Sequence, residues 1–335
     1  MRAMNLEKIS EVEFLTLFNL PIPFSYRSLR VEEGHRPIGF RFSEYIVNIV
    51  ANLDGREFIV CGEAETRELA CAKAFSELIE RSVLISNTST AEALTSNGWA
   101  AHPFKAQAQN NAILELVERD AVLAQWYSST PFLRMNSADL PMEIQNWATL
   151  ELARSEFPKL VLLLSTKGLG PSVTCLLVNE QGFGVSAHCA KEDFDKSVIG
   201  AIAEACRAAH SAIRKEHWRD SLKLKDGVPD LVDPSAHGVY YAYHEPFPDW
   251  MLGETIAWSE ASVLWQKRTS EALADSNFSF QQLLELPVCV GYAKHPNAFD
   301  LSWERTDKEK VVLSAGAKRL NLKSETINEK PHIVS

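Results

Sequence analysis

Residues 61–81 of the chain read CGEAETRELACAKAFSELIER, and the composition changes within them. Residues 40–62 are rich in Ile, Val and Phe, with the turn pair Asp54-Gly55 between two apolar runs, which predicts strand, turn and strand. Ala, Glu, Leu and Arg dominate afterwards, and residues 66–85 are predicted to form a long helix. A strand pair that leads directly into a helix indicates a mixed α/β fold, in which helices cover sheets.

The remaining sequence continues this mixture of helices and strands. Apolar residues at helical spacing predict further helices, and short runs of Val, Leu and Ile predict buried strands. The predicted helices are residues 104–127, 193–215 and 257–287, the predicted strands are 159–165, 172–188 (a hairpin around Gln181-Gly182) and 288–293, and the predicted irregular segments are 86–98, 128–142, 216–238 and the tail from 320. Because no sharp linker divides the chain, one domain over residues 1–335 is expected.

The composition is that of an ordinary globular protein, and it argues against several function classes. Hydrophobic residues make up 46% and charged residues 23%, so the chain can bury a sizeable core. The net charge of −10 argues against a duplex-binding surface, and no nucleic-acid partner is predicted. The N-terminus does not resemble a signal peptide, and no apolar stretch approaches about 18 residues, so a cytoplasmic protein without a membrane segment is expected. The six cysteines form no C-x-x-C pair, which argues against zinc-ribbon and thioredoxin-like sites.

Two of the predicted helices contain nearly the same phrase. Residues 74–81 read AFSELIER, and residues 112–119 read AILELVER. The two glutamates of each phrase are three residues apart and therefore lie on one face of the helix, and an arginine follows each pair. The residues concerned are Glu77, Glu80 and Arg81 in the first phrase and Glu115, Glu118 and Arg119 in the second.

Four carboxylates that are brought together repel one another unless cations neutralise them. Mg²⁺ suits this task because it takes hard oxygen ligands and commonly bridges carboxylates to nucleotide phosphates, which arginines would complement. The predicted helix 193–215 adds Glu204 and Arg207, again three apart, and a glycine-rich phosphate loop is absent from the sequence. These features favour an ATP and Mg²⁺ site built from helix faces. The same phrase is common on solvated helices, so spacing alone leaves a plain surface role open.

The stretches around these glutamates resemble the signatures of the YcaO family. Residues 61–81 resemble the first signature, in which a glycine-containing strand end leads into an Ala-rich helix that ends E-x-x-E-R. SNGWAA at 96–101, leading into AILELVERD at 112–120, resembles the second, and VIGAIAEACR at 198–207 resembles the third. The resemblance covers about residues 40–215, and the chain length suits one full YcaO domain that residues 216–335 would complete.

This resemblance implies a YcaO-like fold of mixed sheets and helices that enclose ATP and Mg²⁺. It also implies that ATP is used to phosphorylate the oxygen of a peptide backbone amide, after which a nucleophile adds to the amide carbon. A Cys, Ser or Thr side chain then gives an azoline, an amide nitrogen gives an amidine, and sulfide gives a thioamide. Cyclodehydration to an azoline in a ribosomally made peptide is the leading expectation, with the other two close behind.

The resemblance also implies roles for individual residues. Both glutamate pairs match the ligands of Mg²⁺ near the phosphates, and Arg119 matches the arginine that contacts phosphate. Among these residues, Glu77, Glu115 and Arg119 are expected to be catalytic. The expected metal ligands are Glu77, Glu80, Glu115 and Glu118, and the expected ATP site joins them with Lys73, Gln107, Asn111, Arg119, Glu204 and Arg207.

Several residues depart from the family pattern. Lys73 stands where the family often has serine, Asn111 stands where it often has glutamine, and Gln107 replaces an upstream glutamate. These changes remove negative charge from the pocket, so either the site holds fewer Mg²⁺ ions with Lys73 in place of one, or Lys73 is peripheral. Family members that form azolines commonly end in a proline-rich tail that enters the active site, whereas this chain ends EKPHIVS with Pro331 alone. The azoline expectation is weaker for this reason, although a short tail could still reach inward.

The expected partners also come from the resemblance. They are a precursor peptide as substrate, a leader-binding or other protein that delivers it, and a second copy of the chain in a homodimer. Gln107 and Lys73 motivate an alternative from another class, a degenerate YcaO subunit that binds peptide or a partner protein without turnover. The retained glutamates favour the enzyme.

Overall fold

The structure of the chain is a computed structural model. It describes residues 6–9, 24–35, 45–87, 97–214, 224–225, 228–229, 234–285, 288–301, 306–328 and 330–333. The chain divides into two compact units, Met1–Ile113 with Ser279–Ala293, and Leu114–Phe278 with Lys294–Ser335. Most of the irregular segments predicted at 86–98 and 216–238 lie outside the described residues.

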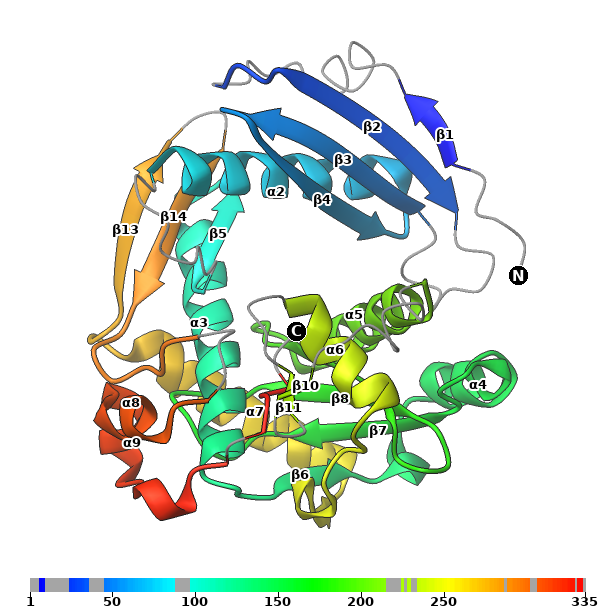
Figure 1. Cartoon of the computed structure of the whole chain (residues 1–335), viewed down its shortest axis with the longest axis vertical. Coiled ribbons are helices and arrows are strands. Elements are labelled where there is room, and N and C mark those ends of the chain that lie inside the picture. Colours follow the sequence, from blue (N-terminus) through cyan, green and yellow to red (C-terminus); the bar gives the residue numbers. More distant parts are fainter. Residues whose placement is uncertain are drawn as a thin grey trace. The chain divides into compact units, whose positions relative to one another are not determined.

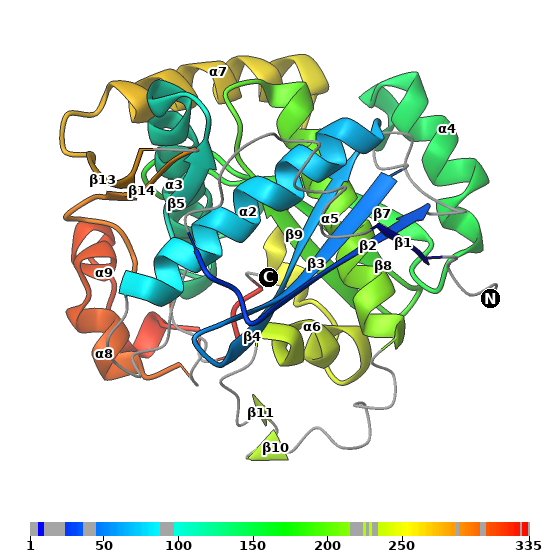
Figure 2. The same cartoon turned by 90° about the horizontal axis from the view of Figure 1, so that it is seen from above.

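The first unit is built on an antiparallel sheet in the order β1-β2-β3-β4 (Figure 1). Its strands are Leu6–Ile9, Ser28–His35, Tyr45–Leu53 and Arg56–Ala64. The predicted turn pair joins β3 to β4 and takes the left-handed conformation, with φ of 52° at Asp54 and 82° at Gly55. Helix α2, Arg67–Asn87, packs against β3 and β4 (Figures 1 and 2). The strand–turn–strand–helix prediction is therefore confirmed.

Gly62 lets β4 and α2 approach closely. A Cβ atom at this position would lie 1.9 Å from the Ala70 carbonyl oxygen and 2.5 Å from the Ala74 nitrogen. Both of these are backbone atoms of a helix, so they could not move aside without shifting α2. The composition change seen in the sequence thus coincides with a close approach of strand and helix.

A three-stranded sheet in the order β13-β14-β5 completes the first unit. Its strands are Ser279–Leu284, Cys289–Lys294 and Trp99–His102, and β14 confirms the strand predicted at 288–293. The prediction of a helix over 257–287 was wrong beyond its first part, because helix α7 comprises Trp258–Ala274 and β13 follows it. Leu283, Leu284 and Val290 pack into the same core as α2, so tertiary contacts favour an extended chain here.

The second unit contains a five-stranded sheet in the order β12-β6-β7-β8-β9. The strands are Leu252–Ile256, Phe132–Met135, Lys159–Leu164, Val173–Val178 and Gly184–Cys189. β12 pairs in parallel with β6, and the other neighbours are antiparallel. The predicted hairpin is confirmed as β8 and β9, with Gly182 at a φ of 84° in its turn. β6 was not predicted and lies inside the segment 128–142, which had been expected to be irregular.

Two of the helices of this unit pack against strands of this sheet. The predicted helix 193–215 is confirmed as α5, Phe194–Arg214, which packs against β8 and β9. Helix α6, Pro234–Tyr243, begins inside the segment 216–238 that was predicted to be a loop, and packs against β9. The remaining helices are α3 (Lys105–Tyr127), whose residues up to Ile113 belong to the first unit, α4 (Met142–Leu150), α8 (Lys308–Leu313) and α9 (Ala315–Leu320). Short elements are β10 (Leu224–Lys225), β11 (Val228–Pro229), η1 (Ser137–Asp139), η2 (Leu152–Arg154), η4 (Asp249–Met251) and η5 (Ser324–Thr326).

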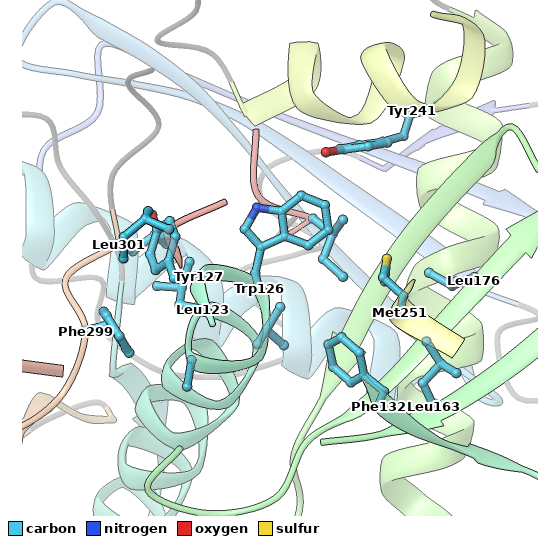
Figure 3. Packing of buried hydrophobic residues seen from close by; sticks show 14 of the residues in the cluster. Leu123, Trp126, Tyr127, Phe132, Leu163, Leu176, Tyr241, Met251, Phe299 and Leu301 are labelled. Atoms are coloured by element: carbon cyan, nitrogen blue, oxygen red, sulfur yellow. The ribbon is translucent and has the colours of Figure 1, made fainter. Parts of the chain in front are cut away.

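Aromatic side chains fill the core of the second unit (Figure 3). Trp126 of α3 is fully buried and meets Tyr241 of α6 edge-on, with 6.0 Å between the ring centroids. Phe132, Leu163 and Met251 belong to the same cluster. Because this cluster joins α3, α6 and the sheet, it fixes the helix that carries the second glutamate pair.

Two polar side chains of α3 are also fully buried, and both have partners. The Gln125 amide nitrogen donates to the Thr130 and Pro131 carbonyls, and its oxygen accepts from the backbone nitrogens of Thr166 and Lys167.

Asp120 forms the other buried polar group. Its carboxylate pairs with Arg319 of α9 at 2.9 Å and accepts from the backbone nitrogens of Leu169 and Phe299. Three distant segments are therefore tied to α3 through one carboxylate.

Candidate functional site

The first predicted glutamate pair lies on α2 in the first unit. Glu77 accepts a hydrogen bond from the Cys61 backbone nitrogen at 3.2 Å, and Arg81 lies 3.9 Å from it one turn further along. The side chains of Glu77 and Arg81 are about one-third exposed, at 34% and 36%. This carboxylate is therefore positioned by the end of β4 and remains open to solvent.

Glu80, the second member of the pair, is half-buried. Burial raises its pKa to about 7, although the Arg81 charge and the Ala101 backbone N–H act in the opposite direction, and Glu77 adds to the increase. A carboxyl group in this state is only partly ionised at neutral pH. A bound cation would supply the positive charge that the protein itself does not provide in full.

Three further predicted residues belong to the same unit as this pair. The Lys73 ammonium donates to the Glu63 carbonyl oxygen at 2.8 Å, which holds it at the junction of β4 and α2. Gln107 donates to Asn111 at 3.0 Å along the first half of α3. The two amides that replace typical family residues are thus bonded to each other.

The second predicted pair lies on the half of α3 that belongs to the second unit. Glu118 is 8% exposed, accepts from the Ala190 backbone nitrogen at 3.1 Å, and lies 3.6 Å from the Arg119 Nε. Burial raises the pKa of Glu118, and the Glu204 charge raises it further, while Arg119 and Lys191 oppose the increase. Glu118 and Glu204 therefore lie close enough to repel, although they come from different helices.

Arg119 is surrounded by carboxylates. Burial alone would lower the pKa of its guanidinium, but Glu118, Glu115 and Glu204 together raise it above its ordinary value. The structure thus brings together four of the predicted site residues within one unit. Arg207 is paired with Glu204 at 3.5 Å on the outer part of α5, where both side chains are more than one-third exposed.

Sequence reasoning missed one cation of this cluster, Lys191. It directly follows Ala190, the residue whose nitrogen contacts Glu118, and its charge acts on that carboxylate. The available signal was weak: a single lysine between the predicted strand 172–188 and the predicted helix 193–215. The set formed by Glu115, Glu118, Arg119, Lys191 and Glu204 is called the α3–α5 cluster below.

The residues fit ATP and Mg²⁺ by their chemistry. No group of three or more side chains in the part of the chain that the structure describes is arranged as a ready metal cage. Mg²⁺ does not require one, because it is usually held by one or two carboxylates together with substrate phosphates and water. The α3–α5 cluster offers carboxylates for the metal and two cations for phosphates.

The comparison with protein-family models shows to which family the chain belongs. Residues 86–270 match the family described as YcaO cyclodehydratase, ATP- and Mg²⁺-binding. The chain belongs to the YcaO family. The matched region contains the second and third predicted signatures and the whole α3–α5 cluster, whereas the first signature at 61–81 lies before it. ATP and Mg²⁺ are thus the ligands of this family, as the sequence predicted.

Solved structures with similar folds are also YcaO proteins or heterocyclases. The YcaO protein from Methanopyrus kandleri bound with AMPPCP and Mg²⁺ is 14% identical, with a TM-score of 0.56 over 86% of this chain and 90% of that one. A heterocyclase in complex with substrate and cofactor is 12% identical, with a TM-score of 0.56 over 97% of this chain and 58% of that one. The E. coli microcin synthetase McbBCD complex with pro-MccB17 bound is 11% identical, with a TM-score of 0.53 over 81% and 88%. A search of curated proteins finds no match.

These similarities confirm the mixed α/β, YcaO-like fold. At such low identity they show the fold alone, so the role of each site residue stays a prediction. Among the described residues, no helix is long and apolar enough to cross a membrane.

Proposed function

We propose that this YcaO protein activates a backbone amide of a peptide with ATP and Mg²⁺, and that it forms azolines from Cys, Ser or Thr residues. The observation that carries the proposal is the α3–α5 cluster, in which the buried Glu118 and two further carboxylates meet two cations inside the matched family region. Amide oxygen is a poor leaving group, and phosphoryl transfer from ATP corrects this. The protein's own contribution is to position the reactants and balance their charge.

Each part of the cluster has a role in this proposal. Glu115 and Glu118 would hold Mg²⁺, with Glu77 and Glu80 of α2 as the other expected ligands. Arg119 would face phosphoryl oxygens, and its pairing with Glu118 keeps the guanidinium in place. Glu204 would complete the negative charge that attracts the metal.

The C-terminal segment supports azoline formation among the possible reactions. Residues 330–333 are bound through main-chain carbonyls: Trp126 donates to Lys330, Tyr241 to Pro331, and Ser186 to Ile333. His188 lies 2.7 Å from the same Ile333 oxygen, and the Arg119 charge lowers the pKa of this histidine. Through His188 the tail therefore lies near Arg119 of the α3–α5 cluster, and this contact supports the azoline reaction within the proposal.

Thioamide or amidine formation remains the alternative among YcaO reactions. The hydrogen-bonded amides Gln107 and Asn111 favour another candidate, a degenerate subunit that binds peptide or a partner protein without turnover. The amide of Gln107 in place of a carboxylate leaves less negative charge for metal ions. The buried Glu118 argues for the enzyme. Burying a carboxylate costs hydration free energy, and a subunit that only binds peptide does not need such a group.

The proposed partners follow from the same reasoning. A precursor peptide would be the substrate, a separate protein would deliver it, and the chain would act as a homodimer in the cytoplasm. The microcin synthetase structure contains a complex with pro-MccB17 bound, which supports a peptide substrate and a protein partner.

Calorimetric titration of ATP with Mg²⁺ tests the proposal, with Glu115→Gln as the variant and Glu271→Gln on α7 as the control. Saturable binding to the wild-type protein that only Glu115→Gln removes would support the site. Incubation with Cys-, Ser- and Thr-containing peptides and the candidate delivery protein then distinguishes the functions. Loss of one water per modified residue supports azoline formation, whereas ATP binding without any peptide modification points to the degenerate subunit.

A further inference from the structure

Lys191 combines a fixed backbone with an exposed side chain. Its backbone nitrogen donates to the Ser197 hydroxyl at 2.9 Å, and its carbonyl oxygen accepts from the Trp265 indole at 3.2 Å. Ser197 and Trp265 are both fully buried. The turn between β9 and α5 is therefore held at Lys191 by two core residues, while Lys191 as a whole keeps an exposed surface.

This turn also touches the carboxylate cluster. The nitrogen of the preceding residue, Ala190, donates to Glu118 at 3.1 Å, so the base of the lysine is fixed next to that carboxylate. The Lys191 charge lowers the pKa of Glu118 and thus opposes the repulsion from Glu204. The position of the lysine is determined by the fold, since three backbone contacts within two residues set it.

The two cations of the cluster differ in their freedom. The Arg119 side chain is 18% exposed and lies 3.6 Å from Glu118, so its guanidinium already has a carboxylate neighbour. Lys191 is exposed and carries its charge on a flexible four-carbon stem with three rotatable donors. A lysine of this kind acts as a mobile point charge, and lysines are common phosphate binders.

We propose that Lys191 binds the terminal phosphates of the nucleotide at the α3–α5 cluster. This inference rests on the proposed function, because it requires Mg·ATP to bind there. In the absence of nucleotide the ammonium offsets the negative charge of Glu115, Glu118 and Glu204. With Mg²⁺ bound, Glu115 and Glu118 would hold the metal, and Lys191 would place its charge against the phosphate oxygens.

The proposal predicts effects of opposite sign for one substitution. Lys191→Met should weaken Mg·ATP and Mg·tripolyphosphate binding by about 10- to 100-fold, the usual range for a lost hydrogen bond to a charged group. Binding of AMP, which lacks the terminal phosphates, should not change. Mg²⁺ alone should bind about 3-fold more tightly, because a positive charge has been removed from beside its ligands. Lys191→Arg should recover most of the ATP affinity.

Calorimetric titrations of these ligands into the full-length protein measure all four effects, with Lys196→Met in the first turn of α5 as the matched control. Unchanged Mg·ATP affinity in Lys191→Met overturns the inference and leaves the proposed function intact. Loss of affinity for Mg²⁺ and Mg·ATP together also overturns it, because that result indicates a structural role. Absence of Mg·ATP binding to the wild-type protein refutes the proposed function, and the inference fails with it.

Discussion

Lowering the pH from about 7 to about 5 should destabilise the protein through one buried side chain, His188. The Ile333 carbonyl oxygen, 2.7 Å from Nε2, can only accept, so Nε2 carries the ring proton and Nδ1 accepts from the Thr174 hydroxyl at 2.8 Å. Both hydrogen bonds thus fix the neutral imidazole. The pKa of His188 is lowered to about 3, chiefly by burial and in part by the nearby Arg119 charge, while the bond to Ile333 partly opposes this.

The sign and size of the effect follow from this pKa. An unfolded histidine has a pKa of about 6.5, so between about pH 6.5 and 3 the unfolded chain binds a proton that the folded chain does not. The contribution of His188 to stability is therefore full above about pH 6.5 and is lost as the pH falls below it. The loss between about pH 7 and pH 5 is about 2 kcal/mol. This value depends little on the folded-state pKa, provided that it stays below about 4.

Urea unfolding of the wild-type protein and of His188→Gln at both pH values measures this term. Glutamine can donate to the Ile333 oxygen but does not titrate, so the free energy of unfolding should fall by about 2 kcal/mol less in the variant than in the wild type. The difference between the two pH responses cancels the titration of all other groups. Parallel responses in the two proteins would refute the assigned protonation state of His188.

Three further substitutions test the packing that positions the site. Asp120→Asn should lower the free energy of unfolding by about 3 kcal/mol, because it leaves the Arg319 charge without its buried partner. Glu180→Gln, which removes the exposed ion pair with Lys159, should change this free energy by less than about 1 kcal/mol. Equal effects of the two substitutions in denaturant titrations would contradict this. Gly62→Ala should cost about 1–3 kcal/mol in thermal unfolding because its Cβ would collide with backbone atoms of α2, and an unchanged melting temperature would contradict the close contact. Trp126→Phe should remove the hydrogen bond to Lys330 and weaken tail docking by about 1 kcal/mol, measured as faster amide exchange at His332 and Ile333; unaltered exchange would show that the tail is held without this bond.

The sequence predicted those parts of the fold whose signals are local. The three long helices α2, α3 and α5 were predicted to within two residues at each end, because their apolar spacing repeats over many turns. The two hairpins followed from turn pairs, and the structure has left-handed backbone at Asp54, Gly55 and Gly182 within them. These signals depend only on neighbouring residues.

Elements stabilised by distant contacts were not predicted. β13 was read as part of a long helix because its leucines and glutamines suit a helix, whereas the neighbouring strand β14 and the core under α2 decide its conformation. β6 and β12 are four and five residues long, too short for a clear alternating pattern, and they pair with each other across more than one hundred residues of chain.

The candidate site shows the same division. The repeated glutamate phrase identified Glu115 and Glu118 from the sequence, and the third helix supplied Glu204. Lys191 escaped notice because a single lysine after a strand has no motif, and its relation to Glu118 arises only when the turn after β9 meets α3. The contact between His188 and the tail could not be predicted from the sequence either, because it joins residues 145 positions apart.

Gln125 has a consequence for how mutations in this protein will be tolerated over evolution. Its amide uses both hydrogens and both lone pairs of the oxygen on four backbone groups, so every bonding capacity of the side chain is filled. Glutamate would place a negative charge against two carbonyl oxygens, and leucine would leave four backbone groups unsatisfied. Purifying selection should therefore hold this position as firmly as a catalytic one. An invariant glutamine next to the glutamate signature would be easy to mistake for part of the active site, although its task is to fold the chain around α3.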